Sequence, residues 1–122
     1  MEISDDTIAF LQRWEGFAPK SYWDYHQWSV GYGSVSYEGE TVTEDVATGR
    51  LRSHLRSYAT SLAGQLTRDP TPEQSTALLS ASYNLGLRGT QNVVELFNSG
   101  DIEGAAHLLR RMDHAGGKRL DA

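Results

Sequence analysis

The sequence predicts an α+β fold, in which a small β-hairpin lobe packs beside a mainly helical lobe. Three observations support this class. A single amphipathic helix opens the chain, a stretch rich in aromatic and β-branched residues follows it, and every later periodic segment has helical spacing. Because pockets favour the boundary between two lobes, we expect a cleft where these lobes meet.

The length and composition fit one globular domain spanning residues 1–122, of which 39% are hydrophobic and 22% are charged. The absence of cysteine excludes a disulfide scaffold and a cysteine-based zinc site. The net charge of −5 disfavours nucleic acid as the main partner, because neutralising phosphates needs a basic surface. No apolar run approaches the roughly 18 residues of a membrane span. The acidic start at residues 1–6 lacks the basic and apolar segments of a secretory signal.

The opening helix is expected over residues 4–15. Ser4 or Asp5 can cap its first turn, where the helix dipole also favours acidic side chains. Gly16 ends the helix, and Pro19 prevents it from resuming at once.

The β lobe is expected over about residues 20–42. Two aromatic-rich strands, at 21–23 and 28–33, are joined by a hairpin turn at 24–27. A third short strand is expected within 35–42.

The helical lobe is expected over about residues 43–114. Its long first helix begins at Thr43 and has one apolar stripe that includes Leu51 and Leu66. The next helix begins at Pro72, with Thr71 as its N-cap. Shorter helices are expected at about 90–98 and 101–112, followed by a turn at 114–118.

Two acidic residues in different settings can carry chemistry. Glu15 ends the opening helix, where the helix dipole and aromatic neighbours favour a protonated carboxyl, as a general acid requires. Asp24 lies at the hairpin turn, where a carboxylate stays ionised, although turns also favour aspartate for local reasons. Ser29, on the opposite strand, can share a water with Asp24, or it is an ordinary strand serine. One protonated and one ionised carboxyl are what glycoside hydrolysis uses.

Three strings of residues carry a resemblance: Glu15-Gly16-Phe17, Tyr22-Trp23-Asp24 and Trp28-Ser29-Val30-Gly31-Tyr32-Gly33. In order and nearly in spacing they resemble the active-site signature of the phage lysozyme family, glycoside hydrolase family 24, whose members are endolysin muramidases. Tyr83-Asn84-Leu85-Gly86 is similar to a further family segment, aromatic-Asn-x-Gly at the end of a helix. The resemblance extends over about residues 8–118 and implies a lysozyme-like fold.

The resemblance also implies an activity. Such enzymes hydrolyse the β-1,4 bond between N-acetylmuramic acid and N-acetylglucosamine in bacterial peptidoglycan, with inversion and with no cofactor. Inversion leaves room for a water between the two carboxyl groups, on the order of 6.5–9.5 Å. By position, Glu15 would be the general acid, Asp24 would orient the attacking water or stabilise the transition state, and Ser29 would hold that water. Ser29 stands where the family usually has threonine.

Four more residues are candidates for binding the substrate. Trp23 and Trp28 can stack on sugar rings, although tryptophans more often belong to a core. Tyr32 belongs to the resembling string, and Asn84 either contacts a substrate amide or caps a helix. The four histidines lack ligand spacing, so no metal site is predicted.

The chain also departs from the family pattern. The hairpin is one residue shorter than usual, and the last helices of the family are missing. We therefore expect an exposed apolar patch near the stripe at 51–66, which favours self-association or a larger assembly. The protein is expected to be made in the cytoplasm of a bacterial host and to reach the wall through a holin-type pore or as part of a virion.

Two alternatives stay open at this point. A lytic transglycosylase uses one glutamate and closes an anhydro ring without water. A cell-wall-binding or virion-associated module would keep the fold but have little or no activity.

Overall fold

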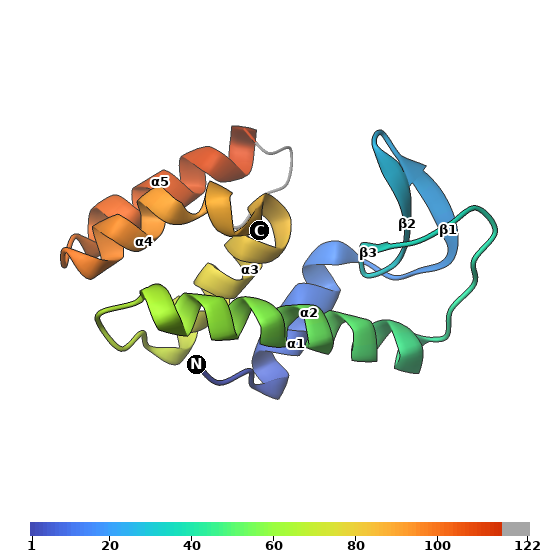
Figure 1. Ribbon diagram of the computed structural model, residues 1–122, viewed down its shortest axis with the longest axis horizontal. Helices are drawn as coiled ribbons and strands as arrows, with labels where there is room; N and C mark the ends of the chain where they lie inside the picture. Colours follow the sequence, from blue (N-terminus) through green and yellow to red (C-terminus); the bar gives the residue numbers. More distant parts are fainter. Residues whose placement is uncertain (116–122) are drawn as a thin grey trace. The chain divides into compact units, whose positions relative to one another are not determined.

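The computed structural model describes residues 1–115 of the chain (Figure 1). The chain divides into two compact units. One is Ile3–His54, and the other consists of Met1–Glu2 and Leu55–Ala122. Each unit is described by itself. Within residues 1–115, no helix combines the length and the apolar character that crossing a membrane requires.

Helix α1, Asp5–Glu15, opens the first unit and confirms the expected bounds. The Ser4 hydroxyl accepts a hydrogen bond from the backbone N–H of Thr7 at 3.1 Å, which satisfies one free donor of the first turn. At the other end Gly16 has a φ of 73° and donates its N–H to the carbonyl of Gln12, so the helix stops there. The side chain of Gln12 donates to Thr48 at 3.0 Å and so links α1 to helix α2, Glu44–Gln65.

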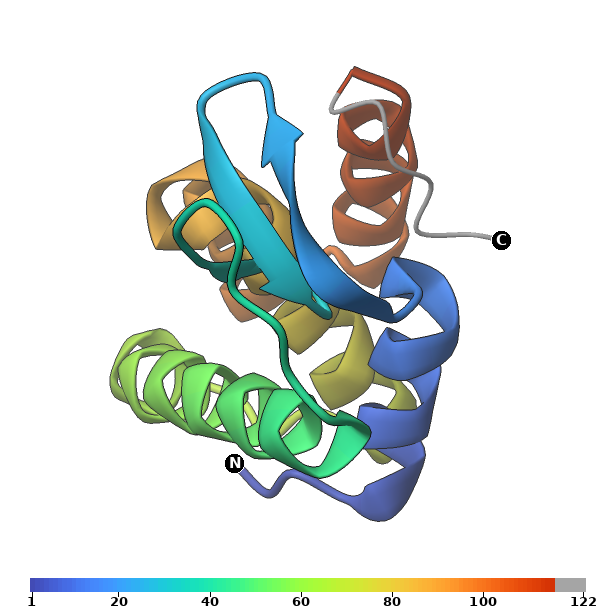
Figure 2. The ribbon, with the colours of Figure 1, turned by 90° about the vertical axis from the view of Figure 1, so that its right-hand side faces the viewer.

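Three antiparallel strands follow in the order β1-β2-β3 (Figure 2). They are β1, Ala18–Asp24, β2, Gln27–Gly31, and β3, Ser34–Val35. Because Asp24 pairs directly with Gln27, the hairpin turn contains only two residues, and not the four at 24–27 that were expected. Beyond β3, the expected strand at 35–42 is reduced to a single bridge between Lys20 and Thr41.

Gly31 explains why β2 ends earlier than its residue types predict. Its φ of 66° lies in the left-handed region, where a strand cannot continue. A Cβ atom at Gly31 would also lie 2.9 Å from the Cβ atom of Ala47 on α2. The sheet therefore approaches α2 at a distance that only glycine allows.

Helix α2, Glu44–Gln65, begins after Thr43, whose hydroxyl accepts a hydrogen bond from Val46. The helix continues across the division between the two units. Most of its apolar stripe is buried, with Leu51, Leu55 and Leu62 fully inaccessible to solvent, and Leu66 just after the helix is half-buried. The expectation of an exposed apolar patch near this stripe is therefore wrong, because these leucines belong to the core.

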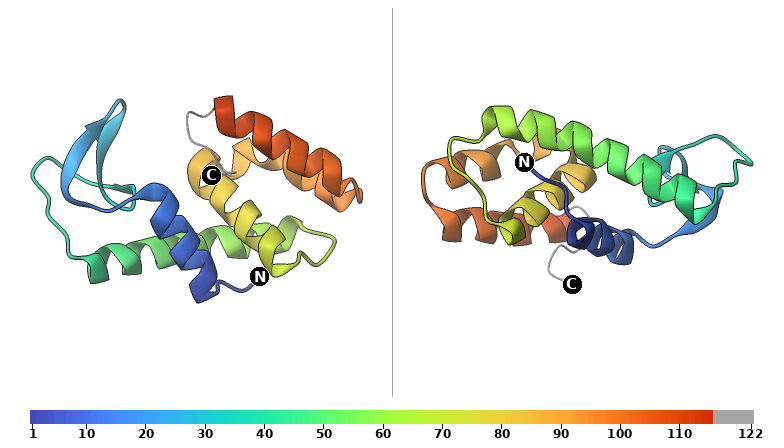
Figure 3. Two further views of the ribbon diagram at one scale, coloured as in Figure 1. Left: turned by 180° about the vertical axis from the view of Figure 1, so that it is seen from behind. Right: turned by 90° about the horizontal axis from the view of Figure 1, so that it is seen from below.

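The remaining helices belong to the second unit. They are α3, Pro72–Gly89, α4, Gln91–Asn98, and α5, Ile102–Ala115. Thr71 and Gln74 form a reciprocal capping box at the start of α3, as the sequence signal at 71–72 indicates. Figure 3 shows α4 and α5 side by side, as their many mutual contacts require.

The end of α5 corrects one prediction. His114 and Ala115 are helical, although the sequence predicted a turn from residue 114. No glycine or proline occurs between Gly104 and Gly116, so nothing in the local sequence ends the helix before Ala115. The rest of the expected turn, 116–118, lies outside the described residues.

Candidate active site

One face of the β1–β2 hairpin carries two of the predicted catalytic residues. Asp24 is paired with Gln27, and Tyr22 is paired with Ser29. Paired residues of neighbouring strands lie on the same side of a sheet, and every second residue of a strand returns to that side. Asp24, Ser29, Tyr22 and Gln27 therefore share one face, which we call the Asp24 face. The predicted proximity of Asp24 and Ser29 agrees with this geometry.

The two polar groups of this pair differ in their access to solvent. Asp24 is exposed near the end of the hairpin, whereas Ser29 is only 1% exposed. Ser29 lies on the central strand, between its pairing partners Tyr22 on β1 and Val35 on β3. Both partners are larger than serine and are themselves exposed, Tyr22 at 44% and Val35 at 67%. The Asp24 face thus holds an open carboxylate and a sheltered hydroxyl.

The Ser29 hydroxyl has a partner on its own strand. The side-chain amide of Gln27 donates a hydrogen bond to Ser29 Oγ at 3.4 Å. Gln27 reaches the hydroxyl because residues two apart on a strand lie on the same side. Sequence reasoning missed Gln27, since no motif distinguishes a glutamine in a hairpin.

The turn of the hairpin is tight and strained. Tyr25 has a φ of 53°, which is uncommon for an aromatic residue, and its side chain is exposed. The backbone N–H of His26 donates to the carbonyl of Asp24. This two-residue turn closes the short hairpin and keeps Asp24 directly opposite Gln27.

Glu15 is the last residue of α1. Its side chain is half-buried, and its Oε2 atom is shielded from solvent. The carboxyl lies at the C-terminal end of the helix, where the helix dipole disfavours negative charge. The indole nitrogen of the neighbouring Trp14 is also buried and has no hydrogen-bond partner among residues 1–115. Glu15 and the Asp24 face belong to the same compact unit.

The two tryptophans of the hairpin occupy its opposite face. Trp23 and Trp28 are paired across the strands, and their rings meet edge to face with centroids 5.8 Å apart. Trp23 is 58% exposed, and Trp28 is half-buried. Trp23 therefore presents a large aromatic surface to solvent, held by Trp28, on the side away from Asp24.

The last two candidates are less accessible. Tyr32 is buried, and its ring centroid lies 5.6 Å from that of Phe17. Asn84 is on α3 in the other compact unit, where its side-chain amide donates to the carbonyl of Ser80 at 2.9 Å. Tyr32 is therefore packed within the first unit, and the role of Asn84 stays a prediction.

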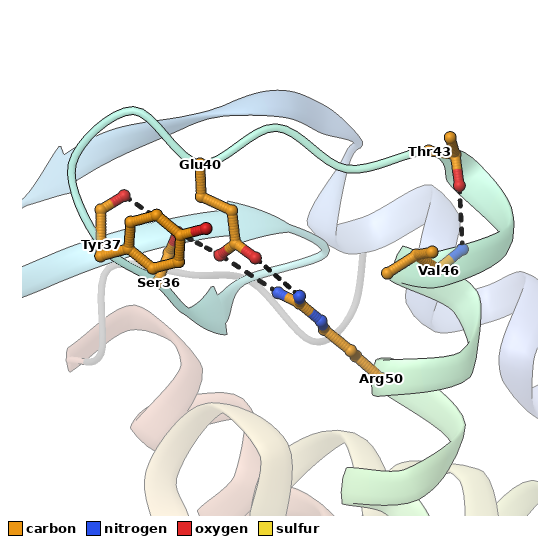
Figure 4. Close-up of polar contacts among 6 residues, drawn as sticks. All are labelled: Ser36, Tyr37, Glu40, Thr43, Val46 and Arg50. Carbon is orange, nitrogen blue, oxygen red and sulfur yellow. Dashed lines mark hydrogen bonds and ion pairs between the residues drawn. The ribbon is translucent and has the colours of Figure 1, made fainter.

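A polar cluster that the sequence did not indicate joins the segment after β3 to α2 (Figure 4). Arg50 donates to both carboxylate oxygens of Glu40, at 2.7 and 3.3 Å, and Ser36 donates to the same carboxylate at 2.7 Å. The hydrogen bonds from Arg50 and then from Ser36 lower the pKa of Glu40 below its usual value. The same pairing raises the pKa of Arg50.

No metal centre is suggested by the part of the chain that the structure describes. Within residues 1–115, no three or more histidine, aspartate or glutamate side chains are arranged to hold an ion.

Comparisons with known proteins agree on one family. The family model described as Phage lysozyme matches residues 12–122. The endolysin of Bacillus phage B103 is 28% identical over 126 residues, covering 97% of this chain but 48% of that protein. The endolysin of Acyrthosiphon pisum secondary endosymbiont phage 1 is also 28% identical, covering 98% of this chain and 86% of that protein. The chain thus spans about half the length of the first of these relatives.

A solved structure supports the same fold. The muramidase domain of SpmX from Asticaccaulis excentricus superimposes with a TM-score of 0.80 and is 26% identical. The match covers 87% of this chain and 76% of that domain. The α+β, lysozyme-like fold that the sequence predicted is therefore confirmed.

Proposed function

Because the chain belongs to the phage lysozyme family, we propose that it degrades bacterial peptidoglycan as a glycoside hydrolase of the muramidase type. The observation that carries the proposal is the Asp24 face, on which an exposed carboxylate and a hydroxyl lie together at the position of the family's signature. Relatives named endolysins and a structural neighbour named a muramidase domain support the same class of activity.

We propose the β-1,4 bond between N-acetylmuramic acid and N-acetylglucosamine as the bond that is cleaved. Glu15 donates a proton to the glycosidic oxygen of the leaving sugar. Glu15 is the last residue of α1, and its Oε2 atom is shielded from solvent. The donated proton neutralises the leaving oxygen as the bond to the anomeric carbon breaks.

A water molecule completes the reaction. Asp24 accepts a proton from this water, and the Ser29 hydroxyl holds the water by a hydrogen bond. The oxygen then bonds to the anomeric carbon from the face opposite to the leaving group, so the configuration inverts. The reaction consumes one water and needs no cofactor.

Substrate contacts are part of the proposal. The exposed ring of Trp23 offers a surface on which a sugar ring can stack. The roles of Trp28, Tyr32 and Asn84 in substrate binding stay predictions. Delivery to the wall, through a holin-type pore or as part of a virion, also stays a prediction.

The test compares the wild-type protein with the Glu15→Gln variant on purified peptidoglycan. We expect the variant to remain folded and to lose activity by roughly 10²–10⁴-fold, because a positioned acid typically supplies that much. Equal rates of new reducing ends for the two proteins would eliminate Glu15 as the acid.

The chemistry of the new ends separates the remaining alternatives. Hydrolysis produces reducing muramic acid ends, whereas a lytic transglycosylase produces anhydro-muramic ends, which mass spectrometry distinguishes. A wild-type protein that binds peptidoglycan but releases no ends of either kind would be a binding module.

A further inference from the structure

We propose that Gln27 is a positioning residue for the reaction, and that it acts by holding the hydroxyl of Ser29 in one orientation toward the attacking water. This inference rests on the proposed function, because it assigns a role within the same site. Neither the sequence signature nor any other feature of the sequence singles out Gln27.

The geometry of the hairpin places Gln27 next to both groups of the pair. It is the direct cross-strand partner of Asp24 and lies two residues before Ser29 on β2. Its side-chain nitrogen lies 3.4 Å from Ser29 Oγ. The amide therefore stands on the Asp24 face, between the exposed end of the hairpin and the sheltered serine.

The hydrogen-bonding capacity of a hydroxyl explains what this contact does. A serine hydroxyl has one O–H donor and two acceptor lone pairs. The Gln27 amide occupies one lone pair, which leaves the O–H and the second lone pair for other partners. A water on the Asp24 face can accept from that O–H or donate to that lone pair while it donates to the carboxylate of Asp24.

The hydrogen bond from Gln27 matters because residue 29 is serine and not threonine. Serine lacks the γ-methyl group that restricts threonine at χ1, so its hydroxyl can occupy three staggered positions. The hydrogen bond from Gln27 favours the position that faces the amide. The side chain of Gln27 thus restrains the rotamer of Ser29. In threonine the γ-methyl group provides this restraint within the residue itself.

The amide is also suited to the place opposite Asp24. It is uncharged, so it donates a hydrogen bond to Ser29 without adding an ion beside the carboxylate. An acidic residue there would place like charges directly across the strands, which is unfavourable.

The experiment measures kcat and KM for Gln27→Met on soluble glycan strands of alternating N-acetylglucosamine and N-acetylmuramic acid. Methionine keeps the length of the side chain and removes the hydrogen bond. We expect kcat to fall roughly three- to tenfold, the effect of losing one hydrogen bond, while KM changes by less than about twofold. A kcat equal to that of the wild type would overturn the proposal.

The same substitution in two Ser29 backgrounds tests whether Gln27 acts through the hydroxyl. With Ser29→Ala, Gln27→Met should cause no further loss, because there is no hydroxyl left to orient. With Ser29→Thr, the loss should shrink to less than about twofold, because the γ-methyl restrains the hydroxyl. An equal loss in the wild-type and Ser29→Ala backgrounds would show that Gln27 does not act through Ser29. If threonine does not fit this buried position, the comparison in the Ser29→Ala background alone decides whether Gln27 acts through the hydroxyl.

Two references complete the design. Gln91→Met on α4 removes a side-chain hydrogen bond of similar length, 3.3 Å to Gln65, and should leave kcat unchanged. The wild-type protein and Glu15→Gln are measured in parallel. A wild type without cleavage contradicts the proposed function itself, whereas a cleaving wild type with a fully active Gln27→Met contradicts only the role of Gln27.

Discussion

Arg50 on α2 donates two hydrogen bonds to the carboxylate of Glu40, ten residues earlier in the chain. Such a fork-to-fork arrangement is specific to the planar guanidinium, which matches both oxygens of a carboxylate. Ser36 donates to the same carboxylate. Two hydrogen bonds therefore tie the segment between β3 and α2 to the helix, and the third lies within the segment itself. All three belong to the unit that also contains Glu15 and the Asp24 face.

This cluster predicts how stability depends on pH. The pKa of Glu40 is lower in the folded protein than its usual value of 4.5, chiefly because Arg50 donates to it. The resulting stabilisation is present above pH 4.5 and is lost as the pH falls through the pKa that Glu40 has in the folded protein. Urea midpoints measured from pH 7 down to pH 3 should therefore fall more for the wild type than for Glu40→Gln. Glu38→Gln, in the same loop, is the control and should follow the wild type. Parallel curves for the wild type and Glu40→Gln would contradict the prediction.

Gly31→Ala should destabilise the protein for two reasons. The left-handed φ of 66° strains any residue with a Cβ, and the new Cβ would lie 2.9 Å from that of Ala47. We expect a loss of about 2–4 kcal/mol in the free energy of unfolding, from strain and overpacking together. Gly39→Ala is the matched control, since Gly39 has a φ of 87° but open space around it. Equal losses for the two variants would show that the contact with Ala47 contributes nothing.

The side chain of Asn98 is expected to stabilise the second unit. This side chain accepts from the N–H of Thr67 and donates to the carbonyl of Gln65, both at 2.9 Å. It thereby joins the end of α4 to the end of α2. Asn98→Ala should cost about 1–3 kcal/mol in thermal or urea unfolding, because it leaves backbone groups without partners. Asn92→Ala, an exposed position on the same helix, should change stability by less than about 0.5 kcal/mol.

Trp23→Ala should weaken glycan binding more than it slows the chemical step. The ring is exposed and lies on the face opposite to Asp24, so it can stack only on a sugar that extends past the hairpin, away from the bond that is cleaved. Its loss therefore removes a stacking surface without disturbing the carboxylate. We expect KM on soluble glycan strands to rise about three- to tenfold, as for the loss of an aromatic contact, while kcat stays within about twofold. Tyr37→Ala removes another exposed aromatic side chain and serves as the control. A KM unchanged by Trp23→Ala would remove this residue from the proposed site.

Local signals in the sequence predicted the ends of several helices correctly. Ser4 and Gly16 bound α1, and Thr71 caps α3, because capping depends only on residues within one turn of the helix. The predicted turn from His114 was wrong, since helix continues there and no breaking residue occurs between Gly104 and Gly116. The third strand was overestimated, since its pairing depends on partners elsewhere in the chain.

In the candidate site, too, some features could be predicted from local sequence and others depend on contacts between segments. The signature strings indicated Glu15, Asp24 and Ser29 as candidates, and the place of Ser29 on the strand opposite Asp24 led us to expect that the two could share a water. Sequence reasoning did not find Gln27, because its role depends on which residues pair across the turn. It also did not anticipate that Ser29, on the central strand, is buried.

By itself, the sequence determined the family, the α+β class, the helix caps and the identities of the acidic candidates, since these depend on residue types at short spacing. Only the tertiary structure decided which residues share the Asp24 face, that the α2 stripe is buried, and that Arg50 binds Glu40. The physical reason is that strand register, burial and ion pairing are set by contacts between segments, and these contacts leave no periodic or local pattern in the chain.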